Sequence, residues 1–296
     1  MFDSLETVSI LALYSAMIIY ALAFIFYTID LSGRASSPGQ QSGQVTRWAR
    51  VGYSLTILAW LLHTAATVMR GIGAHRVPWA NMYEFALTAT AVTVTVYLVA
   101  QFFLEILYLG TLITGLALLF LGITKVGYYV PIAPLQPALD SYWLLIHIIV
   151  AMLAVGFLTL SFGFSVLQLL QTHRIKQQNS GKTPALKFLA GIPDAISLEN
   201  FSYRVAIIGF VFWSFTLVAG AIWAERAWSR YWGWDVKEVW TFVIWVLYAG
   251  FIHARATRGW RGTRSAWLSV ISYSAVIFNF SIVNVYFKGL HAYSGL

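Results

Sequence analysis

Eight long apolar runs constrain what this chain can fold into more than any other feature of its sequence. Their approximate limits are residues 8–29, 50–70, 82–102, 104–123, 142–170, 202–224, 238–256 and 266–287. A helix needs about 20 apolar residues to cross a bilayer, and inside lipid it satisfies all its backbone hydrogen bonds within its own segment. A membrane β-barrel would instead show short segments of alternating polarity. We therefore predict an all-α membrane protein, a polytopic bundle of about eight transmembrane helices.

The composition gives no sign of a separate soluble domain. Of the 296 residues, 59% are hydrophobic and 10% are charged, which is far more apolar than a soluble globular protein. We predict one integral membrane domain over residues 1–296, with an inner loop at about 171–200 and an outer loop at about 225–240. The first run follows Asp3 and Glu6 and lacks a small-residue cleavage site, so we expect a retained span and not a signal peptide.

The distribution of Lys and Arg predicts the orientation of the bundle, because basic residues accumulate in cytoplasmic connections. One assignment of sides places both termini and the loop at 225–240 outside. It leaves seven basic residues outside and twelve inside, the latter being Arg34, Arg47, Arg50, Arg174, Lys176, Lys182, Lys187, Arg204, Arg255, Arg258, Arg261 and Arg264. The net charge of +8 then reflects topology and anionic lipid of the bilayer, so no nucleic acid is expected as a partner.

The chain contains no cysteine. Disulfides, thiolate metal ligands and iron–sulfur ligation by this chain are therefore excluded. Any sulfur chemistry must use the thiols of a partner molecule.

The most unusual stretch runs from Trp228 to Trp240 and reads W-S-R-Y-W-G-W-D-V-K-E-V-W. It places four tryptophans and a tyrosine beside charges of both signs, between two apolar runs. Such a segment offers large flat apolar faces next to fixed charges. It is suited to a flat ligand that carries charge at its edge.

Histidines are placed in two groups by the predicted topology. His147 and His291 fall in the outer layer, with the Trp-rich stretch between them in sequence, while His253 lies close to the inner surface. Two neutral imidazoles are a common ligand pair for iron in a planar macrocycle, and indole rings would cradle such a ring. Arg230, Lys237 or other outer cations would then bind its acidic edge.

The residues alone leave other interpretations open. Tryptophan is enriched at membrane interfaces, so the stretch could be an interfacial belt. Zinc is disfavoured because no close cluster supplies three or four ligands. A proton or ion pathway through His63, Asp235 and Glu238 remains an alternative, although His63 is most simply a hydrogen-bonded packing histidine.

The residues also carry a resemblance. The segments F-S-Y-R-V-A-I-I-G-F, A-G-A-I-W-A-E-R-A-W-S-R-Y-W-G-W-D-V-K-E-V-W and G-F-I-H-A-R resemble the CcsA/ResC family of cytochrome c biogenesis proteins. This family supplies the System II cytochrome c synthase subunit and belongs to the haem-handling group named for its WWD motif. The match is dense over residues 201–296, and S-Y-W-L-L-I-H and V-P-W-A-N-M-Y-E-F support it upstream.

The resemblance implies roles for individual residues. In the family, the WWD loop holds haem on the outer side between two flanking histidines, which match His147 and His291. A further family histidine, matching His253, is associated with haem near the inner side, together with a histidine of a ResB-type membrane partner. Ser229 and Val236 stand where the pattern leads us to expect Gly and Pro. The motif residues matched are Trp228, Trp232, Trp234 and Asp235.

The function implied is membrane haem delivery and covalent attachment of haem to apocytochrome c on the outer face, as part of a cytochrome c synthase (haem lyase) complex. Haem b would be substrate and bound ligand, His147, His291 and His253 would be its axial ligands, and the apocytochrome would carry a C-x-x-C-H motif. We expect the plasma (inner) membrane of a bacterium, in preference to a thylakoid, with the active face outside. The alternatives are a haem exporter without synthase activity and a haem-bearing electron-transfer subunit.

Overall fold

The computed structural model describes residues 2–36, 46–184, 186–287 and 289–291, and this part of the chain is helical with no strand. Eight of its helices are long and apolar enough to cross a membrane, which confirms the predicted fold class. The helices are α1 (Phe2–Ser36), α2 (Arg47–Ala74), α3 (Met82–Ala100), α4 (Gly110–Gly127), α5 (Tyr142–Asn179), α6 (Ala195–Trp228), α7 (Val236–Thr257) and α8 (Thr263–Phe278). Shorter elements are η1 (Leu107–Leu109), η2 (Pro137–Leu139), η3 (Lys187–Gly191), the π-helical turn η4 (Asn279–Val283) and α9 (Asn284–Tyr286).

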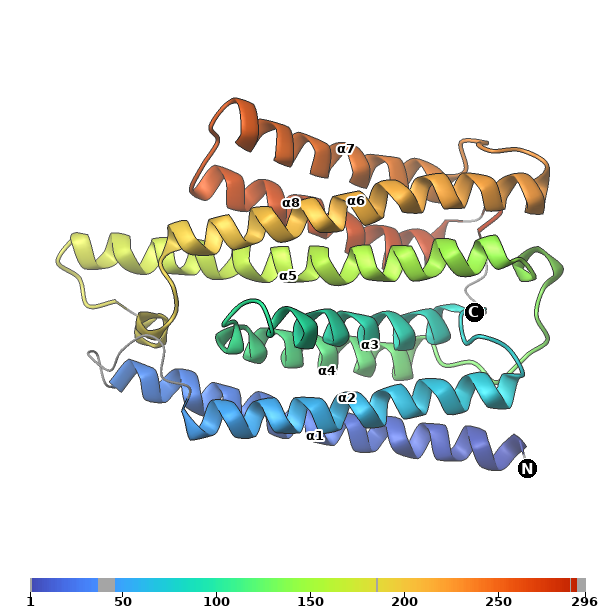
Figure 1. Ribbon diagram of the computed structural model, residues 1–296, viewed down its shortest axis with the longest axis horizontal. Helices are drawn as coiled ribbons and strands as arrows, with labels where there is room; N and C mark the ends of the chain where they lie inside the picture. The colour runs from blue at the N-terminus through green and yellow to red at the C-terminus, as the bar shows by residue number, and fades with distance from the viewer. Residues whose placement is uncertain (1, 37–45, 185, 288, 292–296) are drawn as a thin grey trace.

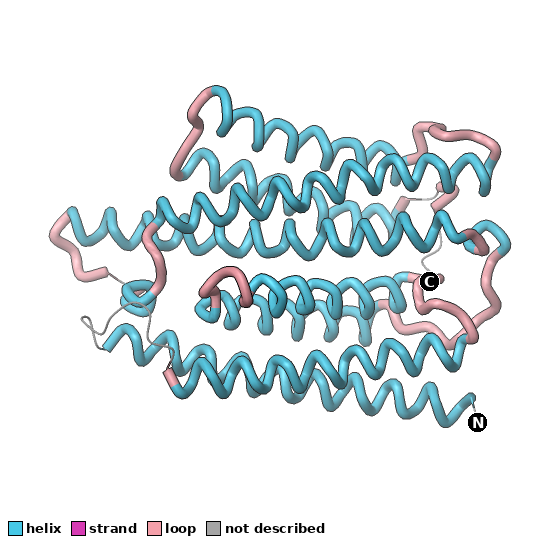
Figure 2. The backbone as a smooth tube through the Cα atoms, viewed as in Figure 1, coloured by secondary structure: helices cyan, strands magenta, loops and turns pink. Residues whose placement is uncertain are grey.

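The long helices run side by side as one elongated bundle (Figure 1). α1 and α2 form one edge, α3 and α4 lie next to them, α5 follows with α6 and α8, and α7 forms the opposite edge. The loops gather at the two ends of the bundle (Figure 2). Because the number of spans is even, α1 begins at the end where α9 lies and where residues 229–235 connect α6 to α7. We call it the outer end, after the predicted orientation.

Several helices extend beyond the apolar runs that predicted them. α5 continues to Asn179 where the run ends near residue 170, and α6 begins at Ala195 where the run begins near 202. Backbone hydrogen bonds continue into polar residues outside the hydrocarbon layer, which hydropathy does not detect. In the other direction, the predicted start of the fourth span at 104 is wrong. The chain turns at residues 101–106, where the Gln101 side chain accepts a hydrogen bond from the Ile106 amide at 3.2 Å.

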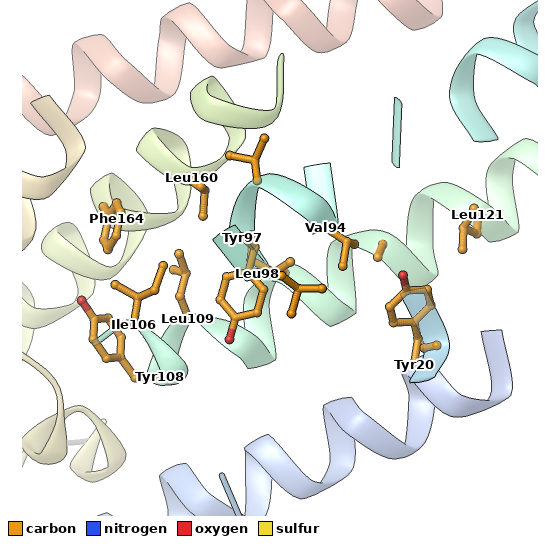
Figure 3. Packing of buried hydrophobic residues seen from close by; sticks show 14 of the residues in the cluster. Tyr20, Val94, Tyr97, Leu98, Ile106, Tyr108, Leu109, Leu121, Leu160 and Phe164 are labelled. Carbon is orange, nitrogen blue, oxygen red and sulfur yellow. The ribbon is translucent and has the colours of Figure 1, made fainter. Parts of the chain in front are cut away.

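The largest packed cluster lies where α1, α3, α4 and α5 meet, and Figure 3 shows its side chains. Tyr97 of α3, Leu109 beside α4 and Phe164 of α5 are fully buried there. Within lipid, small residues let helices approach closely. Gly110 does so here, because a Cβ atom at this position would collide with the ring of Tyr27. The start of α4 is therefore packed tightly against α1.

His63 belongs to this packed region and not to a ligand site. Its side chain is fully buried, its Nε2–H donates to the Leu87 carbonyl at 2.9 Å, and its Nδ1 faces the Tyr20 hydroxyl at 3.5 Å. A carbonyl can only accept, so the proton is on Nε2. The prediction of a hydrogen-bonded packing histidine is confirmed.

Candidate functional site

A cavity of about 450 Å³ lies in the outer half of the bundle, between α3 and α4 on one side and α5 to α8 on the other. We call it the outer cavity. Its volume falls within the range of about 300–1,000 Å³ that is typical of small-molecule sites. Most of its wall surface is apolar, hydroxyl groups are scattered over it, and the charged side chains among the described wall residues are those of Lys237 and Glu238. The wall includes Phe85, Phe120, His147, Trp223, Trp232, Lys237, Asn279, Phe280 and His291.

His147 is held in one orientation by α6. Its Nδ1–H donates to the Thr216 carbonyl at 2.9 Å, and its ring stacks on Trp223 at 6.1 Å between centroids and 20° between planes. Because a carbonyl only accepts, the ring proton is on Nδ1 and Nε2 keeps its lone pair. The described residues make no hydrogen bond to Nε2. A ring in this state is a ready ligand for a metal.

Gly220 explains how the imidazole of His147 can lie so close to the α6 backbone. A Cβ atom at this position would lie 2.8 Å from both Cε1 and Nδ1 of the His147 ring. That separation is too short for any real contact, so a larger residue would displace the ring from Thr216. Gly220 is thus a positioning residue for His147.

His291 is held in the same tautomer by a carboxylate. Its Nδ1–H donates to Asp235 Oδ2 at 2.6 Å, which leaves Nε2 unprotonated when the ring is neutral. Histidines that bind metals are typically oriented by such a second hydrogen bond. Burial lowers the pKa of His291 below its usual value, and the bond to Asp235 offsets only part of this shift. The neutral ring is therefore favoured.

Trp223 and Trp228 bring the two histidines together. The ring of Trp223 stacks on His147 and meets His291 edge-on at 5.5 Å, while Trp228 meets His291 at 4.8 Å. The Trp223 indole is fixed in turn by its Nε1–H, which donates to the Ala138 carbonyl at 3.0 Å. Trp223 was not among the site residues predicted from the sequence. It could have been found as a further tryptophan five positions before Trp228, near the outer end of the apolar run at residues 202–224.

The loop at residues 229–235 folds around the carboxylate of Glu238. Glu238 Oε2 accepts the backbone amides of Gly233 at 2.8 Å and Asp235 at 3.0 Å, and Oε1 lies 3.4 Å from Arg230 Nη1. A glutamate three residues into a helix often satisfies the amide of the N-cap residue in this way. Glu238 thereby sets the position of Asp235, which in turn orients His291.

The three tryptophans of the predicted motif occupy different places. Trp232 lines the outer cavity, and Trp228 packs against His291 behind it. Trp234 is 73% exposed and is not among the described wall residues; it meets Trp232 edge-on at 5.9 Å. The backbone of Trp234 has φ 60°, a left-handed conformation that a bulky residue rarely adopts. The structure thus brings Trp232, but not Trp234, to the cavity.

Ser229 and Val236 sit where Gly and Pro would suit the backbone. Ser229 ends α6 with φ 55°, a left-handed conformation in which Gly is favoured. Val236 is the first residue of α7, where Pro is well tolerated. The loop nevertheless adopts this conformation with Ser at position 229 and Val at position 236.

His253 lies apart from the outer cavity, near the inner end of α7. Its side chain is exposed, and no hydrogen bond, ion pair or ring contact joins its imidazole to the described residues. The described residues also contain no group of three or more His, Asp or Glu side chains that could hold a metal ion. If His253 binds a metal, further ligands must come from outside the described residues.

A family model described as Cytochrome C assembly protein matches residues 79–291, which include every residue of the outer cavity. The Cytochrome c biogenesis protein CcsA of Trieres chinensis is 30% identical over 275 residues, covering 84% of this chain and 88% of that relative. CcsA of Microcystis aeruginosa is 29% identical, with 98% and 96% covered.

A solved structure is similar in fold. The match to Cytochrome c Heme Lyase CcmF has a TM-score of 0.68 at 16% sequence identity, and it covers 93% of this chain. The chain spans only 46% of the length of that protein. At this identity the likeness concerns the fold alone.

Proposed function

Because this chain belongs to the cytochrome c assembly protein family and so acts in cytochrome c biogenesis and haem handling, we propose that it delivers haem to the outer face and takes part in attaching it to apocytochrome c. The observation that carries the proposal is the pair formed by His147 and His291. Each ring is fixed through Nδ1 and keeps Nε2 for a ligand at the outer cavity.

The residues present fit haem as a bound substrate. Two neutral imidazoles suit iron in a planar macrocycle, and the aromatic wall suits its apolar ring. The proposed axial ligands on the outer side are His147 and His291. Trp232 and Trp223 contribute flat faces to the cavity wall, and Asp235 and Trp228 hold His291.

In the proposed reaction the chain mainly binds and orients. The vinyl groups of haem supply the carbons to which the substrate thiols add, each S–H adding across one C=C bond. Both thiols must belong to the apocytochrome, because this chain has no cysteine. The histidine of a C-x-x-C-H segment would replace one of the two protein imidazoles and thereby bring its thiols close to the ring. Such positioning accounts for a large share of the barrier reduction in reactions of this kind.

The inner side needs a second participant in this proposal. We assign His253 to haem near the inner surface, with the remaining ligand supplied by a histidine of a ResB-type partner. The exposure of His253 and its lack of contacts within the described chain support this assignment.

The protein is a multi-pass membrane protein. We propose the plasma membrane of a bacterium; a thylakoid membrane is the alternative, because relatives come from cyanobacteria and plastids.

The proposal is tested by producing the chain together with its partner and an apocytochrome, then measuring covalently bound haem by gel staining. We expect attachment with the wild-type chain and its loss in His147→Ala and in His291→Ala. His173→Ala is the control, since this exposed histidine lies at the inner end of α5. Attachment at wild-type levels in both variants would overturn the proposal. Bound haem without any attachment by the wild-type complex would instead favour an exporter or an electron-transfer subunit.

A further inference from the structure

Lys237 places a positive charge at the wall of the outer cavity. It lies in the first turn of α7, and its Nζ donates to the Asn279 carbonyl at 2.8 Å. An ammonium group has three N–H donors, so two remain after this bond. Among the described wall residues, Lys237 is the cationic side chain. The Lys237 side chain therefore borders the space in which a ligand would lie.

The carboxylates near Lys237 form their direct hydrogen bonds with other groups. Asp235 holds the imidazole of His291, and Glu238 accepts the amides of the 229–235 loop and faces Arg230. No ion pair within the described chain includes Lys237. A cation within a membrane bundle is costly unless a counter-ion accompanies it. The carboxylate of Asp235 lies within electrostatic range of Lys237 but makes no direct ion pair with it, so a ligand carboxylate would complete the pairing.

Asn279 provides a second incomplete polar group at the same place. Its side chain is 5% exposed, it lines the cavity, and its amide oxygen has no partner among the described residues. It is the first residue of the π-helical turn η4, and such turns occur often at functional sites. Rotation about the last side-chain bond exchanges oxygen and nitrogen, so the amide can also offer a donor.

Two other outer cations, Arg226 and Arg230, have partners away from the cavity. Arg230 lies 3.4 Å from Glu238 and 5.9 Å from the ring of Trp228. Arg226 lies over the ring of Tyr142 at 5.5 Å. Neither is among the described wall residues. The structure thus separates Lys237 from the other basic residues that the sequence offered.

We propose that Lys237 and Asn279 form a carboxylate-binding subsite that pairs with one propionate of haem. This rests on the proposed function and adds the orientation of the substrate within its plane. The propionates and the vinyl groups lie on opposite halves of the haem ring. Pairing at the junction of α7 with η4 turns the vinyl half away from Lys237 and leaves it for the thiols of the apocytochrome.

The test compares haem with haem dimethyl ester, whose carboxylates are blocked, in absorbance titrations of the purified protein. We expect the wild-type protein to bind haem roughly 10- to 100-fold more tightly than the ester, as for a charge-assisted pair. Lys237→Met, which is similar in length, is expected to lose this preference while binding the ester as the wild type does. Arg226→Met is the control, because that guanidinium lies outside the cavity wall.

The outcomes separate this inference from the proposed function. Equal binding of haem and ester by the wild-type protein would overturn the carboxylate subsite alone. So would a Lys237→Met variant that binds both ligands equally weakly, since that result indicates a structural role. Asn279→Leu should reduce the preference for haem by a smaller factor, and an unchanged preference would remove Asn279 from the subsite. If the wild-type protein binds neither ligand, the proposed function itself fails.

Discussion

Two polar clusters lie at the outer end of the bundle, and they differ in whether their hydrogen bonds are completed within the chain. The ionic cluster joins α1, α2 and α3 through Glu6, Arg70, Arg76 and Glu84. The ligand cluster joins α5, α7, η4 and the C-terminal segment through His147, Lys237, Asn279 and His291. Both place charged or polar groups where burial is costly.

The ionic cluster is complete at its centre. Arg70 is 1% exposed, and each of its three guanidinium nitrogens has a partner: Nη1 with Glu6 at 2.7 Å, Nε with Glu84 at 3.2 Å and Nη2 with the Val130 carbonyl at 2.9 Å. Glu84 also binds Arg76 at 2.5 Å and the Ala80 amide at 2.9 Å. These bonds join the connection between α2 and α3, and the connection that follows α4, to the helices. Among the buried polar side-chain atoms of this cluster, Arg76 Nε alone lacks a partner in the described part of the chain, and we assign the cluster a structural role.

The ligand cluster is incomplete by comparison. The Nε2 atoms of His147 and His291, two donors of Lys237 and the amide oxygen of Asn279 have no partner among the described residues. All four side chains line the outer cavity. We infer from this difference that the ionic cluster supports the fold and that the ligand cluster binds a molecule in the outer cavity.

The largest predicted effect comes from breaking the ionic cluster. Glu84→Ala leaves Arg76 without its carboxylate and Arg70 with only one, and we expect a loss of about 3–5 kcal/mol in the free energy of unfolding. Thermal unfolding in detergent measures this loss. Glu105→Ala is the control, since Glu105 is exposed in the connection between α3 and α4. A Glu84→Ala protein as stable as the control would contradict a structural role for this cluster.

Gly220→Ala tests the ligand cluster through the position of His147. The added Cβ would lie 2.8 Å from the imidazole, so the ring must move and haem affinity should fall roughly 100-fold. Stability should not fall in parallel, because Ala favours helix more than Gly does. Haem titration followed by absorbance gives the affinity. In Gly250→Ala, where a Cβ meets nothing within 4 Å, affinity should stay as in the wild type; equal losses in both variants would refute the assignment.

Asp235→Asn tests how His291 is oriented, and we expect haem affinity to fall about 10- to 100-fold, as for other second hydrogen bonds to a ligand histidine.

The pH dependence of haem binding by the wild-type protein tests the state of the same ring. Because the folded state lowers the pKa of His291, the protein disfavours the charged ring. Haem retention should therefore be constant from pH 8 to about 6.5, the usual histidine pKa, and fall only as the pH drops further towards the lowered value. A loss that begins above pH 7 would contradict this.

The smallest effects should separate the two tryptophans of the loop. Trp232→Ala removes a wall residue and should weaken haem retention roughly 10-fold, in line with the about 0.5–1.5 kcal/mol of an aromatic contact. Trp234→Ala should weaken retention less, by a few-fold, and without unfolding the bundle, because Trp234 is exposed and acts only through Trp232. Retention measured during dialysis gives both values. A larger loss for Trp234→Ala would reverse their assigned roles.

The sequence predicted the spans well and their ends poorly. The apolar runs mark the hydrocarbon layer, so the number of helices was correct, but α5 and α6 continue into polar residues that hydropathy does not score. The placement of His147 and the Trp-rich loop at the same end of the bundle also followed from chain order. Contacts between helices did not: nothing near Gly220 in sequence indicates that it faces His147, and the tautomer of that ring depends on the Thr216 carbonyl.

The backbone of the 229–235 loop could not be predicted from the sequence either. The exposure of Trp234 follows from its left-handed conformation, which in turn depends on the bonds from Glu238 to the amides on either side. A motif of tryptophans cannot reveal which ring faces a cavity. Similarly, the sequence offered several outer cations for an acidic ligand edge, and only the packing of α7 against η4 distinguishes Lys237.

The central claim is that His147 and His291 bind haem at the outer cavity. The visible absorption spectrum of the purified, haem-loaded protein tests it most directly. We predict the sharp spectrum of iron with two histidine ligands in the wild type and in His173→Ala. We predict that His147→Ala and His291→Ala each lose it, and that added imidazole restores part of it. If both variants keep the wild-type spectrum, the outer cavity does not hold haem through these residues and the account is wrong.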